Sequence, residues 1–232
     1  LLDAGAVAFT DGDRVVEDTR VLSRALTYAR SLGALVIGHP QDPGLSRGAA
    51  ATSGKFASLR GLPGVHPMAE RIGLDRDLGL IEMTGARYHA DQITTARALP
   101  ALERAKANGL DVTAGVSVHH LTLNEFDVGD YRTFFKLVPP LRPEEDRLAV
   151  VQAVASGLID VISSMHTPAD AARLLPAHPC TLVPPTLTPS IAHPRPPADG
   201  PVQHADLLHG GAPIQPVCVQ PDGRHRRGRA RP

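Results

Sequence analysis

Short apolar runs alternate with helix-like stretches over the first 175 residues of the chain. Five apolar runs of strand length end in a polar residue, and they cover residues 6–11 (AVAFTD), 35–39 (LVIGH), 86–89 (ARYH), 112–120 (VTAGVSVHH) and 159–166 (IDVISSMH). Apolar residues at helical spacing follow the first run, at Val21, Leu22, Ala25, Leu26 and Ala29. This alternation predicts an α/β fold with a parallel sheet, built from five strand–helix units.

Glycine and proline place the ends of the other helices. A helix is predicted over residues 67–83, because Pro suits a first helical turn and Gly85 suits a helix end. Further helices are predicted over residues 94–107 and 144–156, while the Gly-rich residues 40–66 lack a period and predict a long loop. The last helix would carry on one face Leu148, Val151, Val154 and Ala155.

The polar residues at the strand ends suggest a shared site. In a closed parallel barrel the carboxyl ends of the strands converge on one mouth, and His and Asp are common metal ligands. The pattern therefore predicts a metal-dependent hydrolase barrel of the TIM type, (β/α)8, of which five units are seen. We expect a partial barrel that leaves strand edges and an apolar helix–sheet face uncovered. Such a chain would be marginally stable or would aggregate unless a partner covers that face, and a homo-oligomer is one form this could take.

Residues 176–232 differ from the rest, since 13 of these 57 residues are Pro and no period is visible. We expect a domain over residues 1–175 and a disordered Pro/Arg-rich C-terminal tail over residues 176–232. One hypothesis is that this tail is out-of-frame translation of a GC-rich gene. The basic end, GRHRRGRARP, lacks the aromatic pattern of RNA-binding segments, so no nucleic-acid partner is expected.

Composition narrows the functional classes. The 24 Lys and Arg balance the 24 Asp and Glu, and no apolar run approaches the roughly 18 residues of a membrane span, so no membrane partner is expected. The first residues show no signal-peptide pattern; they lack an initiator Met and open close to a strand, which suggests that a preceding segment is missing. Cys180 and Cys218 make no disulfide framework, and a cytoplasmic setting is expected.

A series of motifs in fixed order carries a resemblance to a known family. The motifs are GHPQDP (38–43), LRGLPG (59–64) with Ala69-Glu70 and Arg76-Asp77, TGARYH (84–89) with Thr94-Thr95, VTAGVSVHHL (112–121), PPLR (139–142) with EDR (145–147), and GLIDVISSMHTP (157–168). Together they resemble the dihydroorotases, a cyclic-amide branch of the amidohydrolase superfamily, over residues 1–170.

The resemblance implies a zinc-dependent site in a distorted TIM barrel. Two zinc ions would polarise a cyclic amide and activate a bridging hydroxide, and an Asp after the last strand would shuttle the proton. The implied reaction is the reversible cyclisation of N-carbamoyl-aspartate to dihydroorotate in pyrimidine biosynthesis.

Residues carried over by position give a candidate site. Asp11 and His39 match metal ligands of the family, and His89 with Gln92 stands where the family has a metal-binding His-x-x-His. Arg142 and His166 match the substrate-binding side of the site. From the residues alone, a turn role for Asp11 and structural roles for His89 and His166 stay open. His119 and His120 are expected on opposite faces of a strand.

The departures from the family pattern bear on activity. The first metal motif of the family, Asp-x-His-x-His-x-Arg, is absent, and Gln92 and Met165 replace a metal-binding His and the catalytic Asp. Val138 and Ala169 replace two substrate contacts. Two hypotheses remain: a dihydroorotase-type hydrolase that is inactive as this chain alone, or a non-catalytic dihydroorotase-like structural partner of aspartate carbamoyltransferase.

Overall fold

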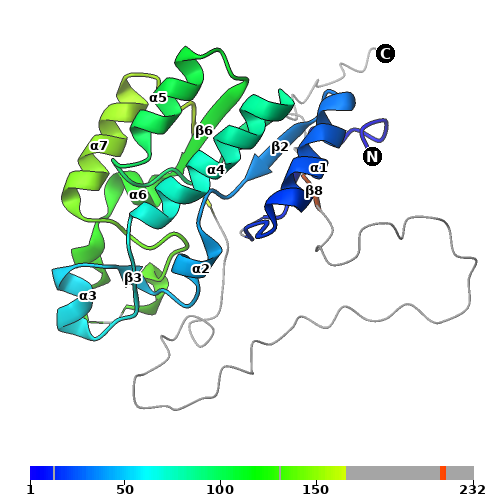
Figure 1. Ribbon diagram of the computed structural model, residues 1–232. Coiled ribbons are helices and arrows are strands. Elements are labelled where there is room, and N and C mark those ends of the chain that lie inside the picture. Colours follow the sequence, from blue (N-terminus) through cyan, green and yellow to red (C-terminus); the bar gives the residue numbers. More distant parts are fainter. Residues whose placement is uncertain (13, 131, 166–214, 218–232) are drawn as a thin grey trace, which may run out of the picture.

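The computed structural model describes residues 1–12, 14–130, 132–165 and 215–217 (Figure 1). Its main sheet has the strand order β7-β6-β5-β2-β1-β8, and the first five of these strands run parallel. The parallel strands are β1 (Ala8–Thr10), β2 (Leu35–Gly38), β5 (Arg87–Ala90), β6 (Val112–Ser117) and β7 (Val161–Ser163). The predicted α/β fold with a parallel sheet is therefore confirmed. Four of the five predicted strand–helix units are described, and the segment that follows β7 beyond Met165 lies outside the described residues.

The longer helices lie along one side of this sheet. They are α1 (Thr19–Ser31), α4 (Met68–Thr84), α5 (Leu99–Ala107) and α7 (Glu144–Ala155). Figure 1 shows α1, α4 and α5 side by side, and each contacts the strand that follows it. Asp18 caps α1 by accepting from the N–H groups of Arg20 and Val21. Gly85 ends α4 with φ 66°, a left-handed conformation that glycine adopts without strain.

The core lies between the sheet and these helices. Its fully buried large side chains include Leu26 of α1, Leu74 and Ile81 of α4, Tyr88 of β5 and Leu102 of α5. Burying each such side chain stabilises the fold by roughly 1.5–3 kcal/mol. One continuous cluster therefore ties α1, α4 and α5 to the sheet and fixes the strand ends that carry the candidate site.

The prediction of a long loop over residues 40–66 is wrong, because this segment folds into short helices and strands. They are α2 (Pro43–Ser46), β3 (Ala51–Thr52), α3 (Lys55–Arg60) and β4 (Gly64–Val65). β3 and β4 pair in parallel as a separate two-stranded sheet. Local hydrogen bonds form these elements: Asp42 Oδ1 accepts from the Leu45 N–H at 2.8 Å at the start of α2. Elements this short leave no period in the sequence.

Three details of the predicted helices are also corrected. α5 begins at Leu99, five residues after Thr94. α7 buries Val150 and Ala153, whereas Leu148 of the predicted apolar face is 53% exposed. His120 lies in a short helix, α6 (Val118–Thr122), not in a strand. Each error arises from tertiary contacts that override the local pattern.

Residues 215–217 of the predicted disordered tail form strand β8 (Gln215–Val217). β8 pairs antiparallel with β1, with Ala8 opposite Val217 and Thr10 opposite Gln215. A proline is tolerated at position 216 because β8 is an edge strand, where a missing N–H breaks no interior ladder. The rest of the predicted tail, and the domain boundary at residue 175, lie outside the described residues.

The opposite edge of the sheet ends at β7. Val161 and Ile162 of this strand are 45% and 54% exposed, and no other strand among the described residues pairs with this side of β7. Within the described residues, β7 is therefore an open edge of the kind expected for a partial barrel. The marginal stability derived from it stays a prediction. Within the described residues, no helix has the length and apolar character needed to cross a membrane.

Candidate functional site

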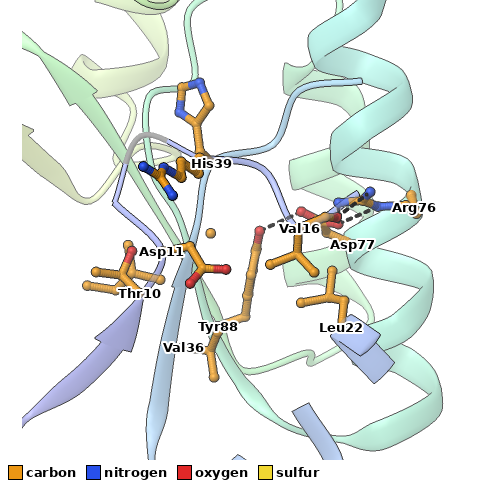
Figure 2. A pocket seen from close by; sticks show the side chains of 12 residues that line it. Thr10, Asp11, Val16, Leu22, Val36, His39, Arg76, Asp77 and Tyr88 are labelled. Carbon is orange, nitrogen blue, oxygen red and sulfur yellow. Dashed lines mark hydrogen bonds and ion pairs between the residues drawn. The ribbon is translucent and has the colours of Figure 1, made fainter. Parts of the chain in front are cut away.

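A pocket at the carboxyl ends of β1 and β2 brings two predicted site residues together. Thr10 of β1 pairs with Ile37 of β2, so Asp11 and His39 follow the two strands at the same edge of the sheet. Both line the pocket, with Tyr88 and Asp77 opposite (Figure 2). Figure 2 shows the Asp11 carboxylate facing Tyr88 and the His39 imidazole turned away from that carboxylate.

Asp11 has a partly buried carboxylate in this pocket. Its Oδ1 atom is buried and accepts no hydrogen bond from the described residues. Burial raises the pKa of Asp11, and the nearby Arg14 guanidinium opposes this shift. A half-desolvated carboxylate at a strand end can take a cation or a proton, which fits the predicted ligand role without establishing it.

Tyr88 and Asp77 form the opposite wall, and we did not single them out from the sequence. Tyr88 donates to Asp77 Oδ2 at 2.7 Å, and Arg76 pairs with Asp77 Oδ1 at 2.7 Å. Burial raises the pKa of Asp77, partly offset by Arg76 and Tyr88. A Cβ atom at position 38 would lie 2.1 Å from the Tyr88 hydroxyl, so Gly38 makes room for this ring. The signal was present, because the Arg76-Asp77 and TGARYH motifs contain these residues.

His89 and Gln92 lie on β5 and just after it, and neither lines the Asp11 pocket. His89 Nδ1 lies 2.8 Å from Thr113 Oγ1, and burial lowers the pKa of His89. Gln92 has φ 61°, an uncommon left-handed backbone for a residue with a side chain. Its amide donates to Asp91 Oδ1 at 3.1 Å and to Ser163 Oγ at 3.3 Å. Gln92 thus links β5 to β7.

Met165 follows β7 and occupies the position matched to the catalytic Asp of the family. It also has a left-handed backbone, with φ 45°, and is 40% exposed. A thioether neither donates a proton nor carries a charge, so Met165 cannot shuttle a proton. His166, predicted to bind substrate, lies outside the described residues.

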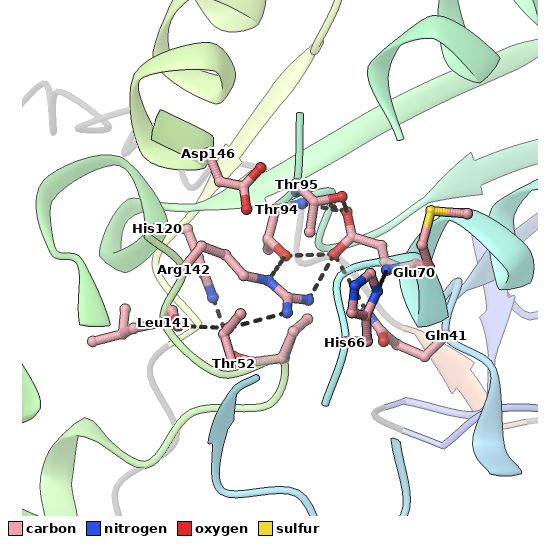
Figure 3. Close-up of polar contacts among 12 residues, drawn as sticks. Gln41, Thr52, His66, Glu70, Thr94, Thr95, His120, Leu141, Arg142 and Asp146 are labelled. Carbon is pink, nitrogen blue, oxygen red and sulfur yellow. Dashed lines mark hydrogen bonds and ion pairs between the residues drawn. The ribbon is translucent and has the colours of Figure 1, made fainter. Parts of the chain in front are cut away.

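Arg142, predicted to bind substrate, is buried in a network of polar side chains (Figure 3). Its guanidinium donates to Thr94 Oγ1 at 2.9 Å, to Thr52 Oγ1 at 3.2 Å and to Glu70 Oε2 at 3.1 Å. Thr52 in turn donates to the Leu141 carbonyl at 2.9 Å. The geometry favours a structural role for Arg142, and its substrate-binding role stays a prediction.

Glu70 of α4 is the centre of this network and is fully buried. Its Oε1 accepts from the N–H groups of Thr94 and Thr95 at 2.7 and 3.0 Å. Its Oε2 accepts from the Thr94 hydroxyl, from Gln41 and from Arg142. The ionised carboxylate is compensated by one cation and several donors, which is what a buried charge requires. This explains why α5 starts late: Thr94 and Thr95 bind Glu70 instead of capping a helix.

His120 packs beside this network with a defined tautomer. Its Nε2 lies 3.1 Å from the Pro139 carbonyl, which can only accept, so Nε2 carries the proton. Nδ1 then accepts from the Ser117 hydroxyl at 3.0 Å. Burial, with the Arg142 charge second, lowers the pKa of His120 to about 4. The ring is therefore neutral in the folded chain at pH 7.

This pKa predicts an acid-sensitive fold. Between pH 6.5 and about 4 the unfolded chain binds a proton at His120 that the folded chain does not, so stability falls as the pH falls. The expected loss is about 3 kcal/mol across this window. Urea unfolding at pH 7 and pH 4.5 should show a larger loss for the parent chain than for His120→Gln. Carboxyl groups with raised pKa, such as Asp77 and Asp146, remain in both proteins and cancel in the comparison. Parallel pH curves for the two proteins would contradict the assignment.

The described residues do not complete a zinc site. Among them, no three His, Cys, Asp or Glu side chains gather so that they could hold a metal ion. Zinc in proteins takes at least three protein ligands at catalytic sites. Asp11 and His39 supply two candidates, and the His39 ring faces away from Asp11. The predicted zinc therefore does not fit these residues alone, and no chemical step is derived through it.

Comparison with known proteins identifies the family. The Dihydro-orotase-like family matches residues 1–98. The chain is 41% identical over 165 residues to a dihydroorotase of Desulforapulum autotrophicum, an alignment that covers 71% of this chain and 39% of that protein. It is also 41% identical over 177 residues to a dihydroorotase-like protein of Pseudomonas putida, covering 76% and 42%. The chain thus spans about two-fifths of the length of these relatives.

Solved structures confirm the fold class. The L-hydantoinase (dihydropyrimidinase) of Arthrobacter aurescens superposes with a TM-score of 0.61 at 19% identity, over 70% of this chain and 38% of that one. The five parallel strands thus have the fold of part of a TIM-type barrel. With the order of motifs and the relatives above, the chain belongs to the dihydroorotase-like family.

Proposed function

We propose that this chain carries part of the scaffold of a dihydroorotase and does not catalyse the reaction alone. The reaction of the complete enzyme would be the zinc-dependent, reversible cyclisation of N-carbamoyl-aspartate to dihydroorotate, in the cytoplasm. One observation carries the proposal: of the predicted metal ligands, only Asp11 and His39 line one pocket of the described residues, while Met165 stands at the position matched to the proton shuttle. Activation of water needs a third metal ligand and proton transfer needs an acid–base group, and the predicted site residues supply neither.

Dihydroorotate turnover by the purified 232-residue chain tests this proposal. We expect no turnover and no bound zinc when zinc is supplied and metal content is measured on the same sample. The dihydroorotase of Desulforapulum autotrophicum, assayed in parallel, controls for the assay. Circular dichroism of the same sample separates an inactive fold from an unfolded chain. Turnover with stoichiometric zinc would overturn the proposal, and Asp11→Asn would then be expected to abolish it.

A second candidate function is that of a non-catalytic partner of aspartate carbamoyltransferase. The observation that favours it is that the differences from the family pattern fall at chemical positions. Gln92 and Met165 replace residues with chemical roles in the family, whereas Glu70 and Arg142 keep a fully satisfied buried network. A chain retained for binding needs its scaffold but not its catalytic groups. Co-sedimentation of the chain with aspartate carbamoyltransferase from the same cell would support this function. Separate sedimentation at micromolar concentrations would exclude it, and a self-associated chain would appear in the same runs.

A further inference from the structure

A second pocket lies between Ala50 and Leu62, which flank β3 and α3, and the loop that follows α6, and we call it the loop pocket. Its apolar wall is made by Leu62, Val128 and Phe135, and its polar rim by Arg132, Thr133 and Lys136. The loop carries two short 3-10 helices, η1 (Glu125–Val128) and η2 (Thr133–Phe135). The loop pocket shares no lining residue with the Asp11 pocket.

The rim of the loop pocket carries two cations and no acid. Neither Arg132 nor Lys136 forms an ion pair with any residue that the structure describes, although carboxylates are close in sequence. Those carboxylates have other partners: Asp130 pairs with Arg60 at 2.6 Å, and Asp127 accepts from the Asn124 N–H at 2.8 Å. The guanidinium carbon of Arg132 lies 5.9 Å from the centre of the Phe135 ring, which holds it over the apolar wall.

The surroundings of the loop pocket concentrate the aromatic residues of the chain. α3, η1 and η2 carry four of the five Phe residues, namely Phe56, Phe126, Phe134 and Phe135. Phe56 and Phe126 pack edge to face with ring centres 5.8 Å apart. An apolar wall next to two cations that have no ion-pair partner among the described residues is the arrangement that suits a ligand with an apolar body and one anionic group.

We propose that the loop pocket binds a small carboxylate with an aromatic or branched aliphatic body. The carboxylate lies between the Arg132 guanidinium and the Lys136 ammonium, with the Thr133 hydroxyl as a further donor. The apolar body packs against Leu62, Val128 and Phe135. The proposal does not depend on the proposed function, because none of these residues belongs to the Asp11 pocket.

Phenylacetate is the probe, and phenylacetamide is its neutral match in shape. Ligand-observed NMR on the 232-residue chain should give a dissociation constant on the order of 1 mM for phenylacetate, as expected for a ligand of this size. Phenylacetamide should bind about tenfold or more weakly than phenylacetate, because it lacks the negative charge. Arg132→Gln and Lys136→Gln should each weaken phenylacetate binding about tenfold and leave phenylacetamide binding unchanged.

Arg24→Gln is the matched control, since Arg24 is an exposed arginine of α1 that forms no ion pair with any described residue. It should leave phenylacetate binding unchanged. Unfolding midpoints of the three variants establish whether each is folded. If Arg132→Gln is not folded, binding of the two ligands to Lys136→Gln tests the proposal instead. Equal binding of the two ligands, equal loss in Arg24→Gln, or no binding at about 20 mM phenylacetate would each overturn the proposal.

Discussion

Arg142→Met is expected to lower the free energy of unfolding by about 3–5 kcal/mol, because it leaves the Glu70 carboxylate buried without a cation. Met keeps most of the volume of the side chain, so the loss reports the charge and the hydrogen bonds rather than a cavity. The variant also removes donors to Thr94 and Thr52. Urea denaturation of the two proteins at pH 7 measures the difference.

Arg47→Met is the matched control for this substitution. Arg47 pairs with Glu17 at 2.9 Å, but both side chains are exposed, so the expected loss is about 0–1 kcal/mol. Adding Glu70→Gln to Arg142→Met should cost less than the sum of the two single losses, since the two residues share one network. If Arg142 serves only a substrate, Arg142→Met will unfold like the parent chain, and the structural role assigned to it is wrong.

Gly73→Ala is expected to destabilise the chain by about 1–3 kcal/mol or more. Gly73 lies on the face of α4 that touches the chain after β2, and a Cβ atom there would lie 2.6 Å from the backbone N and C atoms of Gln41. Backbone atoms cannot rotate away as a flexible side chain can, so α4 or the segment after His39 must shift. The shift would also disturb Gln41, which donates to Glu70 at 3.3 Å. Thermal or urea unfolding measures the loss.

Gly79→Ala in the same helix is expected to change the free energy of unfolding in the opposite direction. A Cβ atom at position 79 meets nothing within 4 Å. Ala is favoured over Gly in a helix interior by about 0.8–1 kcal/mol, so this variant should be more stable than the parent chain. Equal effects of the two substitutions would show that helix propensity, and not the close approach of α4 to Gln41, governs position 73.

The five parallel strands of the main sheet could be predicted from the sequence because they leave local signals, whereas β8 lies in a Pro-rich segment without a period. Each parallel strand is an apolar run, α1 has apolar residues at helical spacing, and Pro67 and Gly85 mark the two ends of α4. The convergence of Asp11 and His39 followed from the same rule, since parallel strands end at one edge of the sheet. The small sheet of β3 and β4 left no such signal because two-residue strands have no period.

The environment of Arg142 could not be predicted in the same way. A charged residue after two prolines is compatible with an exposed loop or with a ligand contact, and only its partners distinguish these. Glu70 is 72 residues away and Thr52 is 90 residues away in the sequence. The prediction of the buried face of α7 was wrong for a related reason. Apolar residues lie on more than one face of this helix, and the packing of α7 against its neighbours buries the face with Val150 and Ala153.

The separation of Glu70 and Arg142 along the chain also sets an order of events during synthesis. The ribosome adds about 5–20 residues per second, so the Arg142 codon is read roughly 4–14 s after that of Glu70. Throughout this interval Arg142 has not been synthesised, so the Glu70 carboxylate has no counterion and Thr52 has no guanidinium donor. The segments holding Thr52 and Thr94 therefore cannot reach their final packing on a nascent chain until the PPLR segment has left the exit tunnel.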